Sequence, residues 1–201
     1  MKTAVVDYQA GNLRSVETAL MHIGADHEIT SDPRKLAEAQ RIVFPGVGDG
    51  AHAMRLLAER GIDSVIRERH AAGIPILGIC LGCQIVLETT EEGGASCLGL
   101  VRGTAKRFPP ECGKVPHMGW NAVRSRDNHW LFSGLPADSS FYFVHSYYPA
   151  PADDGDAVAW CEYGFEFVAA IEHGSLVATQ FHPEKSGEAG LRVLRNFLEA
   201  R

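Results

Sequence analysis

The fold is decided by the stretch Ile74-Pro75-Ile76-Leu77-Gly78-Ile79-Cys80-Leu81-Gly82-Cys83-Gln84, in which an apolar run ends at a cysteine placed between two glycines. The run before Cys80 has the length and the continuity of a strand that is buried on both faces. A Gly-x-Cys-x-Gly pattern at the end of such a strand predicts a sharp turn into a helix, because glycines leave room where segments approach closely. The sulfur of Cys80 is then expected at the carboxyl end of the strand, lifted out of the sheet.

Strand and helix patterns alternate on the amino-terminal side of this turn. Short apolar strands are predicted at 3–7, 41–44 and 74–79, amphipathic helices at 13–23, 51–60 and 62–72, and a further short helix after Asp32-Pro33. This alternation predicts an α/β fold, with residues 1–201 forming a single domain around an open, mostly parallel twisted sheet flanked by helices.

The second half of the chain has shorter apolar stretches than the first. Apolar stretches broken by glycine and proline predict additional strands, several of them antiparallel, at 100–108, 120–123, 141–144, 168–171 and 176–181. A closing helix is predicted over 187–200, where leucines recur on one face.

Composition excludes several classes of partner. The chain has 201 residues, a net charge of -6 and no basic run, so neither nucleic acid nor a membrane surface is expected as a partner. Its apolar start is too short for a signal sequence or a membrane span, and we therefore expect a soluble, cytoplasmic protein. Five cysteines at irregular spacing predict reduced thiols and not a disulfide framework.

Cys80 is the first candidate for chemistry. The NH groups and the dipole of the predicted helix favour its thiolate form over the thiol. Two other interpretations stay open at this point: a small buried structural thiol, which is the common state of free cysteines, and a redox pair with Cys83. A zinc site is the weakest alternative, because the sequence contains no second Cys-x-x-Cys pair.

His182 is the candidate base. It follows the apolar run 176–181 and should lie at the same sheet edge as Cys80, and histidine titrates near neutral pH. Glu184 can orient the imidazole, which completes a Cys, His and acid arrangement. Taken alone, His182-Pro183-Glu184 is an ordinary polar loop. His145 is the next candidate base, and we interpret the following histidines as surface residues: His22, His27, His52, His70, His129 and His173.

A glycine-rich turn, Pro45-Gly46-Val47-Gly48-Asp49-Gly50, follows the predicted strand 41–44 and should open on the same edge of the sheet. Attack on an amide carbonyl requires NH groups directed at the oxygen that becomes negative. The NH of Leu81 is one predicted donor, and this turn is a possible source of the second. A glycine turn without a chemical role remains the alternative.

Three motifs in this order resemble the class I, triad-type glutamine amidotransferases: Pro45-Gly46-Val47-Gly48, Gly78-Ile79-Cys80-Leu81-Gly82 and His182-Pro183-Glu184. Within that family, further strings resemble the glutaminase subunits of imidazole glycerol phosphate synthase, namely Asp7-Tyr8, Gly11-Asn12, Pro116-His117-Met118-Gly119-Trp120-Asn121, His145-Ser146-Tyr147 and Lys185-Ser186. Two residues depart from the family pattern. Gln9 stands where the family usually has glycine, and Cys83 replaces a usual methionine and adds a thiol able to pair with Cys80 under oxidation.

The resemblance implies a flavodoxin-like fold and a hydrolysis of L-glutamine to glutamate and ammonia, without cofactor or metal. Cys80 would be the nucleophile that forms a thioester, His182 the base and Glu184 its partner. The residues implied around the substrate are Val47, Gly48 and Leu81 for the oxyanion hole, and Gly46, Gln84, Ser146 and Tyr147 for glutamine binding.

The resemblance also implies a protein partner. This is a β/α-barrel synthase (cyclase) subunit, bound as a heterodimer, which uses the ammonia to form imidazole glycerol phosphate and aminoimidazole carboxamide ribotide in histidine biosynthesis. Met118, Trp120 and Lys185 are the candidates for the docking face, with core packing as the alternative for Trp120. A glutaminase for anthranilate, purine or pyridoxal phosphate synthesis is the nearest rival, and it is not expected to carry the string 116–121.

Overall fold

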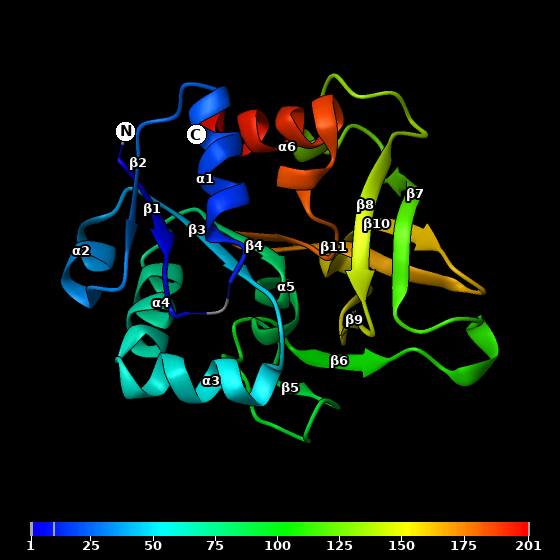
Figure 1. Ribbon diagram of the computed structural model, residues 1–201, viewed down its shortest axis with the longest axis horizontal. Helices are drawn as coiled ribbons and strands as arrows, with labels where there is room; N and C mark the ends of the chain where they lie inside the picture. The colour runs from blue at the N-terminus through cyan, green and yellow to red at the C-terminus, as the bar shows by residue number, and fades with distance from the viewer. Residues whose placement is uncertain (1, 10, 201) are drawn as a thin grey trace.

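A computed structural model describes residues 2–9 and 11–200, and these residues form a nine-stranded mixed sheet flanked by helices, with a three-stranded sheet beside it (Figure 1). The strands are β1 (Thr3–Val6), β2 (His27–Thr30), β3 (Arg41–Gly46), β4 (Ile76–Cys80), β5 (Thr89–Thr90), β6 (Gly103–Arg107), β7 (His117–Ser125), β8 (Ser140–His145), β9 (Tyr147–Pro151), β10 (Ala157–Glu162), β11 (Glu166–His173) and β12 (Leu176–Thr179). The helices are α1 (Leu13–His22), α2 (Pro33–Glu38), α3 (Gly50–Glu59), α4 (Ile62–Ala71), α5 (Leu81–Ile85) and α6 (Gly187–Glu199), with 3-10 turns η1 (Pro110–Cys112), η2 (Trp130–Phe132), η3 (Asp154–Asp156) and η4 (Pro183–Lys185).

The order of strands in the large sheet is β2-β1-β3-β4-β12-β11-β10-β7-β8. The strands from β2 to β12 in this order pair in parallel, and every later pairing is antiparallel. The small sheet has the order β5-β6-β9. The predicted α/β class, parallel in the first half and with antiparallel strands in the second, is confirmed.

Alternate residues of the parallel strands face two different layers of helices. Val5, Val43 and Leu77 pack in the core that includes α1 and α6, whereas Ala4 and Ile42 pack in the core that includes α2, α3 and α4. Figure 1 shows α1 and α6 together on one side of the sheet. Burial on both faces explains why these strands are continuously apolar in sequence. Within residues 2–9 and 11–200, no helix has the length and apolar character needed to cross a membrane.

Glycines allow three segments to meet at Cys80. A Cβ on Gly82 would lie 2.0 Å from the carbonyl oxygen of Phe44 on β3, and a Cβ on Gly78 would lie 2.8 Å from the Cβ of Ala178 on β12. The predicted reason for these two glycines, the close approach of neighbouring segments, is therefore what the structure shows. Because β4 lies between β3 and β12, the turn at its end is enclosed by the ends of both neighbours.

One predicted surface residue is buried. The interpretation of His129 as a surface residue is wrong, because its imidazole contacts two polar groups inside the fold. Its Nε2 lies 2.9 Å from a carboxylate oxygen of Glu172, and its Nδ1 accepts from the NH of Leu131 at 3.3 Å. These contacts satisfy both ring nitrogens and allow the burial.

Candidate active site

Cys80 lies at the junction of β4 and α5, in a backbone conformation that side chains of L residues rarely adopt. Its φ is 54° and its ψ is -104°. Strained conformations of this kind persist only where surrounding structure enforces them, and they concentrate at functional sites. Cys80 is 5% exposed. Leu81 begins α5, and NH groups in the first turn of a helix have no partner within the helix.

His182 and Glu184 reach the same edge of the sheet, because β12 runs parallel to β4 with Thr179 opposite Ile79. Nδ1 of His182 lies 2.7 Å from Oε1 of Glu184, and both side chains are fully buried. A carboxylate only accepts, so Nδ1 carries a proton. Nε2 has no hydrogen-bond partner among the residues that the structure describes.

The electrostatic surroundings of His182 favour its charged form. Burial lowers the pKa of His182, but the interactions with Cys80 and Glu184 outweigh that effect and raise it to about 10. The site therefore holds a charged imidazole near the candidate nucleophile.

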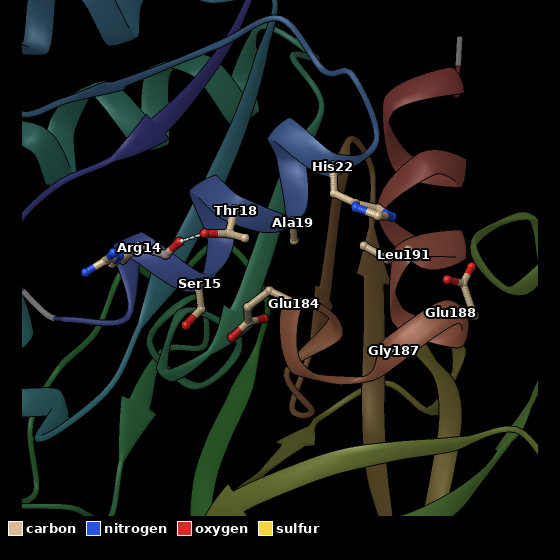
Figure 2. A pocket seen from close by; sticks show the side chains of 9 residues that line it. All are labelled: Arg14, Ser15, Thr18, Ala19, His22, Glu184, Gly187, Glu188 and Leu191. Carbon is tan, nitrogen blue, oxygen red and sulfur yellow. Dashed lines mark hydrogen bonds between the residues drawn. The ribbon is translucent and has the colours of Figure 1, made fainter.

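Asn12, at the amino end of α1, contacts the acid from another element. Its backbone is left-handed, with φ 64°, and its side chain makes no capping hydrogen bond to its own helix. Instead Nδ2 donates to Oε1 of Glu184 and lies 3.4 Å from Nδ1 of His182. Figure 2 shows the Glu184 carboxylate between α1, near Ser15, and the turn that leads into α6. From sequence, Asn12 belongs to the family motif Gly11-Asn12 but has no predicted role, because asparagine before a helix is usually a capping residue.

A pocket of about 270 Å³ opens over Cys80, and most of the predicted site residues line it. Its volume is at the small end for ligand sites, which fits a ligand of amino-acid size. The predicted residues in the lining are Cys80, Val47, Gly48, Leu81, Gln84, Ser146 and Tyr147. Gly46 is not part of this lining. It pairs with Cys80 across β3 and β4, and a Cβ there would lie 2.1 Å from the hydroxyl of Tyr8.

Glu92 also lines the pocket, and it was not among the residues predicted from sequence. Its Oε2 accepts a hydrogen bond of 2.7 Å from the NH of Gly50 at the start of α3. Burial and the charge of Asp49 raise the pKa of Glu92, while the NH of Gly50 opposes that shift. In the sequence, Glu92 stands in an acidic, glycine-containing turn and has no signal that separates it from a surface acid.

His145, the alternative base, is held in a different network. Its Nδ1 lies 2.8 Å from the carbonyl oxygen of Tyr147, and its Nε2 lies 2.9 Å from Nδ1 of His117. Burial lowers the pKa of His145 to about 3, with the charges of His117 and His182 acting in the same direction and the Tyr147 carbonyl opposing them. With both nitrogens occupied, His145 is poorly suited to take a proton from the sulfur.

The other cysteine of the Cys-x-x-Cys pair is a buried thiol. All five cysteines are free, and burial together with the nearby Cys80 raises the pKa of Cys83 well above the usual range. Cys83 therefore stays protonated near neutral pH, which makes it a poor attacking group in thiol exchange.

The residues predicted for docking lie outside the pocket, on one surface. Met118 and Trp120 are two positions apart on β7 and are 61% and 57% exposed, so the core-packing interpretation of Trp120 is wrong. The ring of Tyr142 on β8 lies 6.2 Å from Trp120 and 6.0 Å from Nζ of Lys185. The carbonyl of Tyr142 also accepts from the NH of His182 at 2.9 Å, so this surface adjoins the His182 and Glu184 pair.

Comparison with known proteins gives the following matches. The family model described as glutamine amidotransferase class-I matches residues 4–200. Imidazole glycerol phosphate synthase subunit HisH of Methylococcus capsulatus is 52% identical, over 97% of this chain and 94% of that protein. The protein of the same name in Acinetobacter baylyi is 48% identical, over 98% of each.

Solved structures share the fold. A putative GMP synthase protein from Thermoplasma acidophilum has a TM-score of 0.73 at 25% identity, covering 98% of this chain and 92% of that one. PurLQS from Thermotoga maritima has a TM-score of 0.76 at 22% identity, covering 98% and 97%, a likeness of fold alone.

The pKa of His182 should depend on Glu184. In Glu184→Gln we expect it to fall well below about 10, because the carboxylate charge that holds the proton is lost while burial remains. An NMR titration of the labelled imidazole measures this. Glu188→Gln, an exposed change at the start of α6, is the control and should leave the pKa of His182 in place. An equal pKa of His182 in Glu184→Gln and Glu188→Gln would contradict the pairing of His182 with Glu184.

Proposed function

The chain belongs to the class I glutamine amidotransferases, and from that premise we propose that it is the glutaminase subunit of an imidazole glycerol phosphate synthase. The glutaminase activity is supported by the position of Cys80 in a small pocket, where it interacts with the imidazole of His182, which is paired with the buried carboxylate of Glu184. The assignment to this synthase is supported by curated relatives of that name that match nearly the whole chain.

The first step is the attack of the Cys80 thiolate on the side-chain amide carbon of L-glutamine. A carbon–sulfur bond forms, and the carbonyl electron pair moves to oxygen. Leu81, Val47 and Gly48 line the pocket together with Cys80. In this proposal their backbone NH groups stabilise the oxyanion once they are directed at it.

His182 moves the proton in both halves of the reaction. Its imidazolium protonates the amide nitrogen, the carbon–nitrogen bond breaks, and ammonia leaves a thioester on Cys80. The neutral imidazole then takes a proton from water, which attacks the thioester and releases glutamate and the thiolate. Glu184 keeps the proton on Nδ1 of the ring, and Asn12 holds that carboxylate by a hydrogen bond from a different helix.

The remaining pocket residues suit the amino-acid end of glutamine. We assign the carboxylate of Glu92 to the substrate ammonium group, because it is the acidic side chain in the lining. Gln84 and the backbone of Ser146 and Tyr147 supply further polar contacts. Gly46 lies outside the pocket lining and pairs with Cys80. We assign it a role through its backbone, since Tyr8 and Leu81 occupy the space that a side chain would need.

Met118, Trp120, Tyr142 and Lys185 form a docking surface for the synthase partner, which is a β/α barrel in this proposal. Two large apolar side chains exposed on one strand are typical of an interaction site. Because the surface adjoins His182, ammonia would be released close to the partner. A reactive free thiol at Cys80 fits a reducing, cytoplasmic setting.

Ammonia release from glutamine tests the activity. We expect the wild-type chain to release ammonia and Cys80→Ala to release it at least about a thousandfold more slowly, because Cys80 is the cysteine in the lining of the pocket. Cys97→Ala, a buried thiol outside the pocket, is the matched control. Wild-type-like activity in Cys80→Ala would contradict the role of Cys80.

We further expect the ammonia release of the wild-type chain to be low alone and to rise with the synthase partner, because the turn at Gly46 to Gly48 is free to direct the Val47 NH away from the substrate. Full activity of the wild-type chain without the partner would contradict the activation by the partner.

Docking is tested by charge reversal. Lys185→Glu should weaken binding of the synthase partner and raise the Kd about tenfold, since it replaces the cation of the docking surface by an anion. Lys35→Glu is the control for a change of net charge alone, because Lys35 is on α2, which contacts β1 near the opposite end of the large sheet from β7. An isothermal titration that gives one Kd for wild type and both variants would remove Lys185 from the interface.

A further inference from the structure

Gln180 is a buried polar residue without a role in the steps proposed above. It directly follows β12, whose parallel pairing with β4 brings it beside Cys80. Gln180 is 0% exposed, and its Nε2 lies 3.7 Å from the sulfur of Cys80. Its Oε1 lies 3.0 Å from Nε2 of Gln84, which is itself 5% exposed. Buried amides are oriented by the partners that satisfy them, so these contacts decide which atom faces the sulfur.

The carbonyl of Tyr147 fixes the direction of both amides. A carbonyl oxygen can only accept, so the Gln84 atom at 2.8 Å from it must be the NH₂ group. The second hydrogen of that group is donated to Oε1 of Gln180. The NH₂ group of Gln180 is therefore the end that faces Cys80. If the Gln180 amide were turned by half a rotation, its NH₂ group would face the NH₂ group of Gln84, and its carbonyl oxygen would face the sulfur of Cys80.

A second donor holds the same carbonyl in place. Nδ1 of His145 lies 2.8 Å from the Tyr147 oxygen, and Nε2 of His145 lies 2.9 Å from His117. His117 and His145 are opposite each other in the pairing of β7 with β8. The orientation of the Gln84 and Gln180 amides thus depends on the Tyr147 carbonyl. That carbonyl is held by His145, on β8, and through it by His117, on β7, the two strands that carry Met118, Trp120 and Tyr142.

We propose that Gln180 donates a hydrogen bond from Nε2 to the sulfur of Cys80 and favours the thiolate, and that Gln84 and the Tyr147 carbonyl keep it in that orientation. This inference rests on the proposed glutaminase function and adds a positioning residue to it. A thiol accepts hydrogen bonds weakly, whereas a thiolate is a charged acceptor, so an NH donor stabilises the charged form. Unlike His182, an amide does not titrate, and it stays a donor when the imidazole has given up its proton.

Besides the amide of Gln180, which does not titrate, several titratable groups face the sulfur. Tyr8, after β1, and Cys83, on α5, both have a pKa raised by burial and by Cys80, so both stay neutral near pH 7. His182 faces it from the segment after β12, with Glu184 behind the imidazole. All four residues are left unchanged in the variants used to test the proposal.

The test is the pH dependence of alkylation of Cys80 by iodoacetamide, followed by mass spectrometry in the absence of glutamine. In Gln180→Met, which keeps the volume and removes the donor, we expect the alkylation midpoint to rise by about one pH unit. Gln84→Met should produce a smaller rise, and the double variant should match Gln180→Met, because both act through one hydrogen bond. Gln40→Met, an exposed glutamine before β3, is the matched control and should leave the midpoint unchanged.

An unchanged midpoint in a folded Gln180→Met would overturn the proposal, as would full additivity of the two single variants. Should Gln180→Met fail to fold, Gln180→Glu serves instead, because it places an oxygen where the donor stood and should raise the midpoint further. A failure of the proposed function is distinct, since it appears as wild-type protein that releases no ammonia even with the synthase partner, whatever the alkylation midpoint.

Discussion

The backbone conformation of Cys80 is the constraint on which the site depends. A φ of 54° at a residue with a side chain costs on the order of 1–3 kcal/mol, and it persists because β4 is enclosed by β3 and β12. Gly82 lets α5 pack against the carbonyl of Phe44, which holds the turn closed. With the turn fixed, the pocket, the start of α5 and the residues after β12 all converge on one sulfur atom.

Local signals made the centre of the site predictable. The glycine spacing around Cys80 and the position of His182 after an apolar run are properties of short segments, and both follow from where strands end. Contacts across the sheet leave no such signal. Asn12 meets Glu184 from a distant part of the chain, and Glu92 resembles a surface acid in sequence, so only the fold reveals them.

The strands that the sequence did not predict have physical reasons of their own. β2 is a short edge strand with polar residues and no alternation, β5 has two residues, and β9 contains two prolines, which its place at the edge of the small sheet allows. β10 is rich in alanine, which has low strand propensity, and is stabilised by pairing on both sides. His129 is buried because Leu131, a sequence neighbour, pairs with one ring nitrogen, and Glu172, distant in sequence, pairs with the other.

The sulfur of Cys80 is proposed to attack the amide of glutamine and to carry the acyl group, and every other role assigned in the site follows from that step. Rapid acid quenching of the chain with L-glutamine during turnover, followed by mass spectrometry of its peptides, detects this group directly. We expect a γ-glutamyl group on the peptide that contains Cys80, lost on treatment with hydroxylamine as a thioester should be. Ammonia release with no adduct on that peptide, or an adduct that persists in Cys80→Ala, would contradict the proposed step.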